Sequence, residues 1–228
     1  MKKVYFILVL MINLSLGNAQ IYEIGVFGGG SNFIGDVGST KFIAPNEIAI
    51  GGLIRWNRSP RHSYRASVIY TTMFADDNLS SDPRREQRGY YFSAKTLEIS
   101  TGIEFTFLDF NLHSGDFNFT PYVYTGISVL SHRNFYFVNN TFILGKSNSN
   151  AFGIPIALGA KFTLTEHLIF GMEIAARYTF SDEIDGSLPD PEELNSLKFG
   201  NINNNDWYVF SGFTLTYTFG RNPCFCIY

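Results

Sequence analysis

Alternation of large apolar residues with small or polar ones recurs along the chain and is clearest over residues 207–219. In this segment the odd positions are mostly large and apolar, whereas positions 212, 214, 216 and 218 carry Gly or Thr. Because successive side chains of a strand point to opposite faces, such a segment has one apolar face and one polar face. This pattern is typical of a strand that crosses a membrane as part of a barrel.

Eight segments of this kind are predicted, and each is long enough for a tilted strand to cross a bilayer, which takes about 9 to 11 residues. They are residues 21–30, 47–57, 62–74, 93–107, 119–130, 152–164, 168–180 and 207–219. The connections after the even-numbered segments are tight (57–61, 108–118, 165–167), and those after the odd-numbered segments are long and polar (31–46, 75–91, 131–151, 181–206). This alternation predicts an all-β fold, an eight-stranded antiparallel transmembrane β-barrel with short periplasmic turns and long extracellular loops.

The N-terminus predicts export from the cytoplasm. Lys2 and Lys3 precede an apolar run over residues 4–16, and Gly17-Asn18-Ala19 supplies the small residues of a cleavage site. We therefore expect a signal peptide over residues 1–19, a barrel over residues 20–219 and a periplasmic tail over residues 220–228. Position 20 is Gln rather than Cys, so the usual lipid attachment is not expected. The predicted location is the outer membrane of a Gram-negative bacterium, with the strands held in lipid.

Composition agrees with a membrane barrel and disfavours a nucleic-acid partner. Aromatic residues make up 17% of the 228 residues against 16% charged residues, and the net charge is −3. Nucleic-acid binding depends on basic patches, which this charge does not favour. Aromatic rings prefer the headgroup level of a bilayer. Two such belts are predicted, an outer one at Tyr70, Phe74, Tyr178, Phe180 and Trp207 and an inner one at Tyr22, Trp56, Tyr64, Phe107, Tyr217 and Phe219.

Strand parity places eight charged side chains inside the barrel. They are four acids and four bases: Glu23, Glu98, Glu104, Glu173, Arg55, Arg65, Lys161 and Arg177. Eight strands leave an interior just wide enough for side chains to fill, and buried charges are costly unless they are paired. We expect one ion-paired layer of Glu23, Arg55, Arg65, Glu104 and Lys161 toward the periplasmic end, and a second layer around Glu98, Glu173 and Arg177. Such charges are the polar filling of a plugged barrel; a proton or ion pathway is the alternative.

A soluble lipocalin-like barrel is the competing fold. It would place apolar residues inward around a ligand and charges outward, and it would need no aromatic belts.

The sequence predicts no enzyme, no cofactor, no metal and no small-molecule substrate. Ser131 and His132 are the best candidates for a nucleophile and its base, but neighbours on a strand face opposite ways. The acidic segment 182–186 could hold calcium, yet it lacks EF-hand spacing, and we expect a solvated loop. Gly28-Gly29-Gly30 is not followed by a helix and is therefore no phosphate loop.

The tail after the last strand carries both cysteines of the chain, Cys224 and Cys226. An intramolecular disulfide or two free thiols is one interpretation, although the spacing closes only a strained small ring. The other is that Phe225, Ile227 and the cysteines dock to, or crosslink with, a periplasmic protein.

Residues 22–38 resemble the opening of the PorG family, outer-membrane barrels of the type IX secretion and gliding apparatus. The resemblance continues through residues 54–57, 92–105 and 120–126. It implies a non-enzymatic component that anchors a periplasmic ring, built from an outer-membrane lipoprotein and its partner subunit, to the membrane. The surfaces expected to contact the ring are residues 108–118 and 221–228, represented by Asp109, His113, Arg221, Cys224, Phe225, Cys226 and Ile227. The alternative function is adhesion or membrane stabilisation through the extracellular loops.

Overall fold

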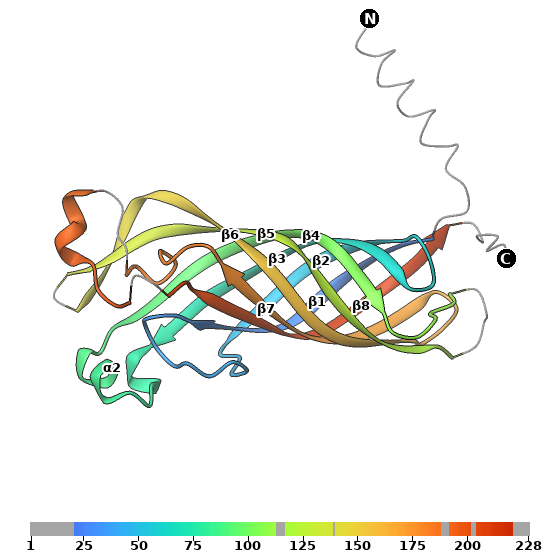
Figure 1. The fold of residues 1–228 in the computed structure, drawn as a ribbon, viewed down its shortest axis with the longest axis horizontal. Coiled ribbons are helices and arrows are strands. Elements are labelled where there is room, and N and C mark those ends of the chain that lie inside the picture. The colour runs from blue at the N-terminus through green and yellow to red at the C-terminus, as the bar shows by residue number, and fades with distance from the viewer. Residues whose placement is uncertain (1–20, 113–116, 139, 188–191, 202–203, 221–228) are drawn as a thin grey trace, which may run out of the picture.

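The eight predicted strands form a closed barrel in the computed structural model, which describes residues 21–112, 117–138, 140–187, 192–201 and 204–220. Each strand pairs antiparallel with its sequence neighbours, and β1 pairs with β8 to close the cylinder (Figure 1). The strands are β1 (Ile21–Ile34), β2 (Glu47–Asn57), β3 (His62–Asp76), β4 (Tyr91–Thr106), β5 (Phe119–Val138), β6 (Thr141–Thr163), β7 (Leu168–Thr179) and β8 (Trp207–Gly220). The predicted fold class is therefore confirmed.

The strand faces are the ones that the alternation predicts. In β3, every inward residue from Ser63 to Met73 is buried, and the outward Tyr64, Val68 and Tyr70 are exposed. Large apolar side chains cover the outside of the other strands too, for example Ile24, Ile99, Ile127 and Phe213. All eight predicted interior charges are buried. The lipocalin-like alternative is wrong, because its faces would be reversed.

Both ends of the barrel sequence lie at one end of the cylinder. Figure 1 shows the start of β1 and the end of β8 at the end that also carries the short turns, while the long connections gather at the opposite end. Three short helices belong to these long connections: η1 (Asp77–Leu79), α2 (Pro83–Arg88) and η2 (Glu192–Leu197). In an even-stranded transmembrane barrel the short turns are periplasmic, so the long connections form the extracellular end. None of the helices among the described residues is long and apolar enough to span a bilayer.

Two predicted loops are partly strands. The sequence predicts a loop over residues 131–151, but β5 and β6 continue through this segment as a hairpin that projects past the other strands (Figure 1). Its alternation is interrupted by a register shift between Arg133 and Phe135, which hides the strands from a periodicity argument. β1 likewise runs four residues further than predicted, to Ile34, because Ser31, Asn32, Phe33 and Ile34 keep pairing with β8.

The extracellular half of the interior contains an apolar core, which the sequence did not predict. Phe27, Leu53, Ile69 and Met73 line the lumen there and belong to a buried cluster that extends into the loops. The loops add the aromatic rings of this cluster, among them Phe33, Phe92, Phe135, Phe137, Tyr90 and Phe199. Most of the interior charges therefore lie toward the periplasm, whereas the outer half is mainly apolar and contains the Arg177–Glu98 pair beside Phe210.

The predicted signal peptide (1–19) and the tail residues 221–228 lie outside the described residues.

Candidate functional site

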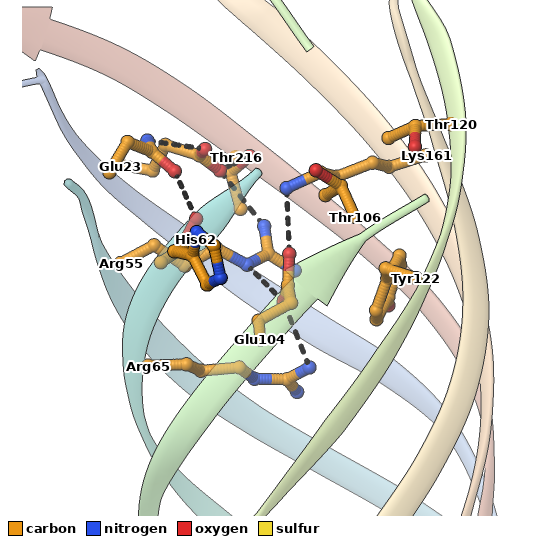
Figure 2. Close-up of polar contacts among 12 residues, drawn as sticks. Glu23, Arg55, His62, Arg65, Glu104, Thr106, Thr120, Tyr122, Lys161 and Thr216 are labelled. Carbon is orange, nitrogen blue, oxygen red and sulfur yellow. Dashed lines mark hydrogen bonds and ion pairs between the residues drawn. The ribbon is translucent and has the colours of Figure 1, made fainter. Parts of the chain in front are cut away.

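The periplasmic half of the lumen contains a continuous network of ion pairs. Arg55 of β2 bridges two acids, with 2.9 Å from its Nη1 to Glu23 Oε2 and 2.9 Å from its Nε to Glu104 Oε2. Lys161 of β6 reaches Glu104 from another wall of the barrel, with 2.6 Å from Nζ to Oε1. Figure 2 shows these side chains converging from different strands on the axis of the barrel. Each is at most 1% exposed, so the network is sealed from water.

Neutral groups supply further hydrogen bonds to the acid Glu23, whereas Nη2 of Arg55 has no partner among the described residues. Glu23 accepts from Asn57 Nδ2 and from Thr216 Oγ1, each at 2.8 Å. Buried charges stabilise a fold only when their remaining hydrogen-bonding capacity is also satisfied. These contacts, which come from β2 and β8, meet that condition for Glu23.

Glu173 lies in a different layer from the one that the sequence predicts. The sequence predicts a layer of Glu98, Glu173 and Arg177, but Glu173 of β7 pairs with Arg65 of β3, at 2.6 Å from Nη1 to Oε2. Its Oε2 also accepts a hydrogen bond from Tyr122 at 2.6 Å.

The height of Glu173 in the barrel could not be read from the sequence because barrel strands tilt and are staggered. Its neighbours in the sheet are Gly159 and Gly212, and the lack of a side chain at Gly159 leaves room for the ring of Tyr122, whose hydroxyl donates to Glu173. The second layer therefore consists of Arg177 and Glu98, at 3.0 Å from Nη2 to Oε1, with Tyr208 donating to Glu98 at 2.7 Å.

Ser131 and His132 do not form a catalytic pair. His132 is buried and points into the barrel, whereas Ser131 is half-buried on the outer face. Ser131 and His132 therefore face opposite sides of β5, as the alternation of side chains along a strand predicts.

A folded cap covers the extracellular mouth. Arg88 of α2 is central to it: its guanidinium contacts Asp77 at 2.8 Å and lies 4.9 Å from the ring centres of both Tyr90 and Phe199. Arg88 also donates to the backbone oxygen of Asp36 at 2.7 Å. The connection after β1 is therefore tied to the connection after β3 by a charged residue in an aromatic setting.

Four buried aspartates, Asp36, Asp182, Asp185 and Asp206, lie at the extracellular end, and Asp185 joins the last extracellular connection to the first. Asp185 accepts from the backbone N–H of Asp36 at 2.7 Å, and Asp206 accepts from that of Ile184 at 3.0 Å. Neither carboxylate oxygen of Asp182 has a hydrogen-bond partner among the described residues. The expectation of a solvated acidic loop at 182–186 is wrong, because Asp182 and Asp185 are packed under the cap.

Burial raises the pKa of three of these aspartates. For Asp182 the pKa rises to about 7, because of burial first and then the nearby charges of Asp185, Asp36 and Glu183. The pKa of Asp185 is raised, and that of Asp206 well above its usual range, again mainly by burial. Within the described part of the chain, no group of three acidic, histidine or cysteine side chains is arranged to hold a metal ion.

The periplasmic end is closed by the turn between β4 and β5. Phe110 of this turn is buried, and its ring centre lies 4.9 Å from Lys161 Nζ. The backbone N–H of Phe110 donates to Pro60 in the neighbouring turn at 3.1 Å. Asp109, one of the predicted partner contacts, is exposed and pairs with Arg61. The other six, His113, Arg221, Cys224, Phe225, Cys226 and Ile227, lie outside the described residues.

Apolar side chains are displayed at the same end. Leu108, Phe117 and Leu164 are each more than half exposed, and Phe117 reaches 72%. Phe117 and Leu164 border a small groove between the β4–β5 and β6–β7 turns, together with Leu112 and Glu166. The groove faces the periplasm.

A family model described as a domain of unknown function, DUF6089, matches residues 2–228 of the chain. The chain belongs to the DUF6089 family. None of the curated proteins matches its sequence.

Solved structures similar to this DUF6089 chain include Ail, the attachment invasion locus protein of Yersinia pestis, with 10% identity and a TM-score of 0.48, covering 88% of this chain and 99% of that one. The N-terminal β-barrel domain of Pseudomonas aeruginosa OprF has 11% identity and a TM-score of 0.44, with 89% and 99% covered. A major outer membrane protein from Thermus thermophilus has 13% identity and a TM-score of 0.46, with 89% and 100% covered.

Sequence reasoning missed three parts of the DUF6089 barrel that bear on function. The apolar core had a visible signal, since Phe27 and Ile69 stand at inward positions by parity. The aspartate cluster had only a weak signal in the sequence. Asp36, Asp185 and Asp206 come from distant segments, so the sequence does not show that they meet. The plug at Phe110 had none, since a lone apolar residue in a polar turn does not indicate burial.

Proposed function

We propose that this DUF6089 barrel is a non-enzymatic outer-membrane component of a protein secretion machine of the type IX class, which anchors a periplasmic ring complex to the membrane. The resemblance of residues 22–38 to the PorG family suggests the class of machine. The ring would include an outer-membrane lipoprotein. What supports a role in anchoring, rather than in transport through the barrel, is the way the lumen is filled.

The side chains that the structure describes fill the lumen at several heights. Ion pairs fill its periplasmic half, Phe110 closes one end and the aromatic cap closes the other. A barrel that cannot pass a substrate acts through its surfaces.

The observation that carries the proposal is the construction of the periplasmic end. The described part of its largest turn, residues 107–112, is held against the barrel by the buried Phe110 and by the backbone contact of Phe110 with Pro60. This end exposes Leu108 and Phe117, together with Leu164 from the next turn. Contiguous exposed apolar patches rimmed by polar residues mark sites of contact with proteins, membranes or ligands, and in this proposal the contact is with the ring.

The test is the capture of ring subunits by the detergent-solubilised barrel. Leu108→Asp with Phe117→Asp should abolish capture of the lipoprotein and its partner subunit, because a charge would be buried in the interface. The matched control is Leu79→Asp, since Leu79 is 60% exposed on η1 at the extracellular end. The control should capture the ring normally. Equal capture by all three proteins would overturn the anchoring proposal.

Adhesion or membrane stabilisation through the extracellular loops is the second candidate. The feature that favours it is the cap, in which the loops are built into a fixed surface by the Arg88 contacts. Replacement of the exposed hairpin tip should abolish this function and leave ring capture intact, whereas the Leu108 and Phe117 substitutions should do the reverse.

A further inference from the structure

The apolar outer surface of the barrel ends abruptly on β4, β5 and β6. On β4 the outward residues Ile99 and Leu97 are exposed and apolar, and the next outward residue is Lys95. On β5 the outward series runs from Val129 through Ser131 to Arg133. On β6 the exposed Phe152 is followed by Asn150 and Asn148. Lys95 and Arg133 therefore stand immediately beyond the lipid-facing belt.

The register brings these two cations to the same place on the rim. Thr96 of β4 pairs with His132 of β5, and this is the last pair that joins the two strands at that end. Lys95 lies one residue beyond Thr96 toward the extracellular end of β4, and Arg133 lies one residue beyond His132 toward the extracellular end of β5. Both side chains face outward and are exposed. Their neighbours across the other strand edges are the uncharged Thr72 and Asn148.

No carboxylate in the described part of the chain forms an ion pair with either cation, Lys95 or Arg133. Arg133 Nε donates to the backbone oxygen of Gly145 at 3.1 Å, which holds the side chain against the hairpin. Like charges on adjoining strands are destabilising. An anion bound beside both cations would attract each of them and offset the repulsion between them.

The height of the pair identifies the anion. The apolar belt below it marks the hydrocarbon layer, and the first polar row beyond such a belt lies among the lipid headgroups. Basic residues at that level attract anionic headgroups, each contributing about 1 kcal/mol. An Arg guanidinium and a Lys ammonium are the two side chains that bind phosphate most often.

We propose that Lys95 and Arg133 form a binding site for the phosphorylated headgroup of a lipid in the outer leaflet. The site is independent of the secretion role, because it lies at the opposite end of the barrel from the ring surface. Binding of a headgroup at this site would fix the orientation of the barrel and its depth in the membrane on the β4–β5 side.

The test measures lipid binding to the purified barrel in detergent by native mass spectrometry. The probes are lipid A carrying its two phosphates and the same lipid after enzymatic removal of the phosphates. Wild type should bind the phosphorylated form preferentially. Loss of about 1 kcal/mol per cation predicts binding about fivefold weaker for Lys95→Gln or Arg133→Gln, and about thirtyfold weaker for the double variant.

The matched control is Arg84→Gln with Lys198→Gln, which removes two exposed cations from the cap instead of the rim. This control should bind phosphorylated lipid A as wild type does. All variants should show heat-modifiable migration on gels, which reports a folded barrel.

Three results would overturn the proposal. The double variant could retain wild-type affinity, or it could lose affinity for both forms of the lipid equally, which would point to packing of the acyl chains. Alternatively, inorganic phosphate alone could raise the melting temperature of wild type, but not of the double variant, as much as lipid A does. The occupant would then be a free anion.

Discussion

At the residue scale, the unusual feature of this barrel is a set of fully buried charges that cross the lumen. Arg65 and Glu173 come from β3 and β7, which lie four strands apart and therefore face each other across the barrel. Desolvating such a pair costs several kcal/mol, which the pairing and its hydrogen bonds offset. The sequence could predict that these residues point inward, because parity decides the face. It could not predict which residue meets which, because partners depend on the stagger of the strands.

Breaking the Arg65–Glu173 pair should cost more than removing it. Arg65→Met or Glu173→Leu alone should lower the free energy of unfolding by about 3 to 5 kcal/mol, since each leaves a buried charge without its partner. The double variant Arg65→Met with Glu173→Leu should be clearly more stable than either single variant. Reversible urea unfolding in lipid vesicles measures this cycle. Additive effects of the two substitutions would show that the residues do not interact.

The surface pair Arg61–Asp109 supplies a control for this cycle. Both side chains are more than half exposed, so replacing either should change stability by about 1 kcal/mol or less.

Asp182 should make the extracellular cap less stable as the pH rises. Its folded pKa of about 7 lies above the ordinary value of 3.8, so the folded cap holds a proton that the unfolded loop releases. The contribution is fully favourable below pH 4 and is lost progressively between about pH 4 and pH 7. Amide hydrogen exchange of residues 181–187 should therefore be slower at pH 5 than at pH 7.5, after correction for the intrinsic rate. Asp182→Asn should flatten this difference.

At the element scale, periodicity predicted all eight strands but not the elements that close the two ends. The strands alternate because lipid lies on one side and the lumen on the other. The outer parts of β5 and β6 meet a different environment: Phe135 and Phe137 pack on the cap, and the outward Asn148 is exposed. In the sequence, this segment resembles a loop, because one face is polar and the register shift interrupts the alternation. The turn after β4 is polar in sequence, and nothing in it indicates that Phe110 is buried.

Phe110 should prove structural, unlike its neighbour Phe117. Phe110→Ala should lower the free energy of unfolding by about 3 kcal/mol, because the ring is buried against Lys161 and a cavity would remain. Phe117→Ala should change it by less than about 0.5 kcal/mol, because that ring is largely exposed. Urea unfolding of the two variants in the same vesicles makes the comparison. Equal effects would show that the turn does not plug the barrel in solution.

At the scale of the whole molecule, the barrel is closed at three heights by different means. Phe110 lies at the periplasmic end, the ion pairs of Glu104 fill the adjoining half, and the aromatic cluster fills the extracellular half. The sequence predicted a plugged barrel from the number of strands and the balance of charges. Its biological role could not be predicted from periodicity, because alternation reports only on lipid and lumen.

The purified barrel should show no steady ionic conductance in a planar lipid bilayer. Phe110→Ala should leave it closed as well, because the ion pairs and the aromatic cluster remain. Recordings with a large porin in the same bilayer supply the positive control. Uniform, lasting conductance steps from the wild-type protein would contradict a filled lumen.

The seam between β1 and β8 joins the first and last strands of the barrel over fourteen consecutive residue pairs, from Ile21 with Gly220 to Ile34 with Trp207. Until β8 arrives, both β1 and β7 present bare backbone amides and carbonyls, which hydrocarbon cannot satisfy. A stable form within the membrane therefore requires the final fourteen residues of the barrel. A chain that lacks β8 cannot close the barrel and leaves unpaired backbone groups in the hydrocarbon, so only chains with all eight strands can reach the stable membrane form.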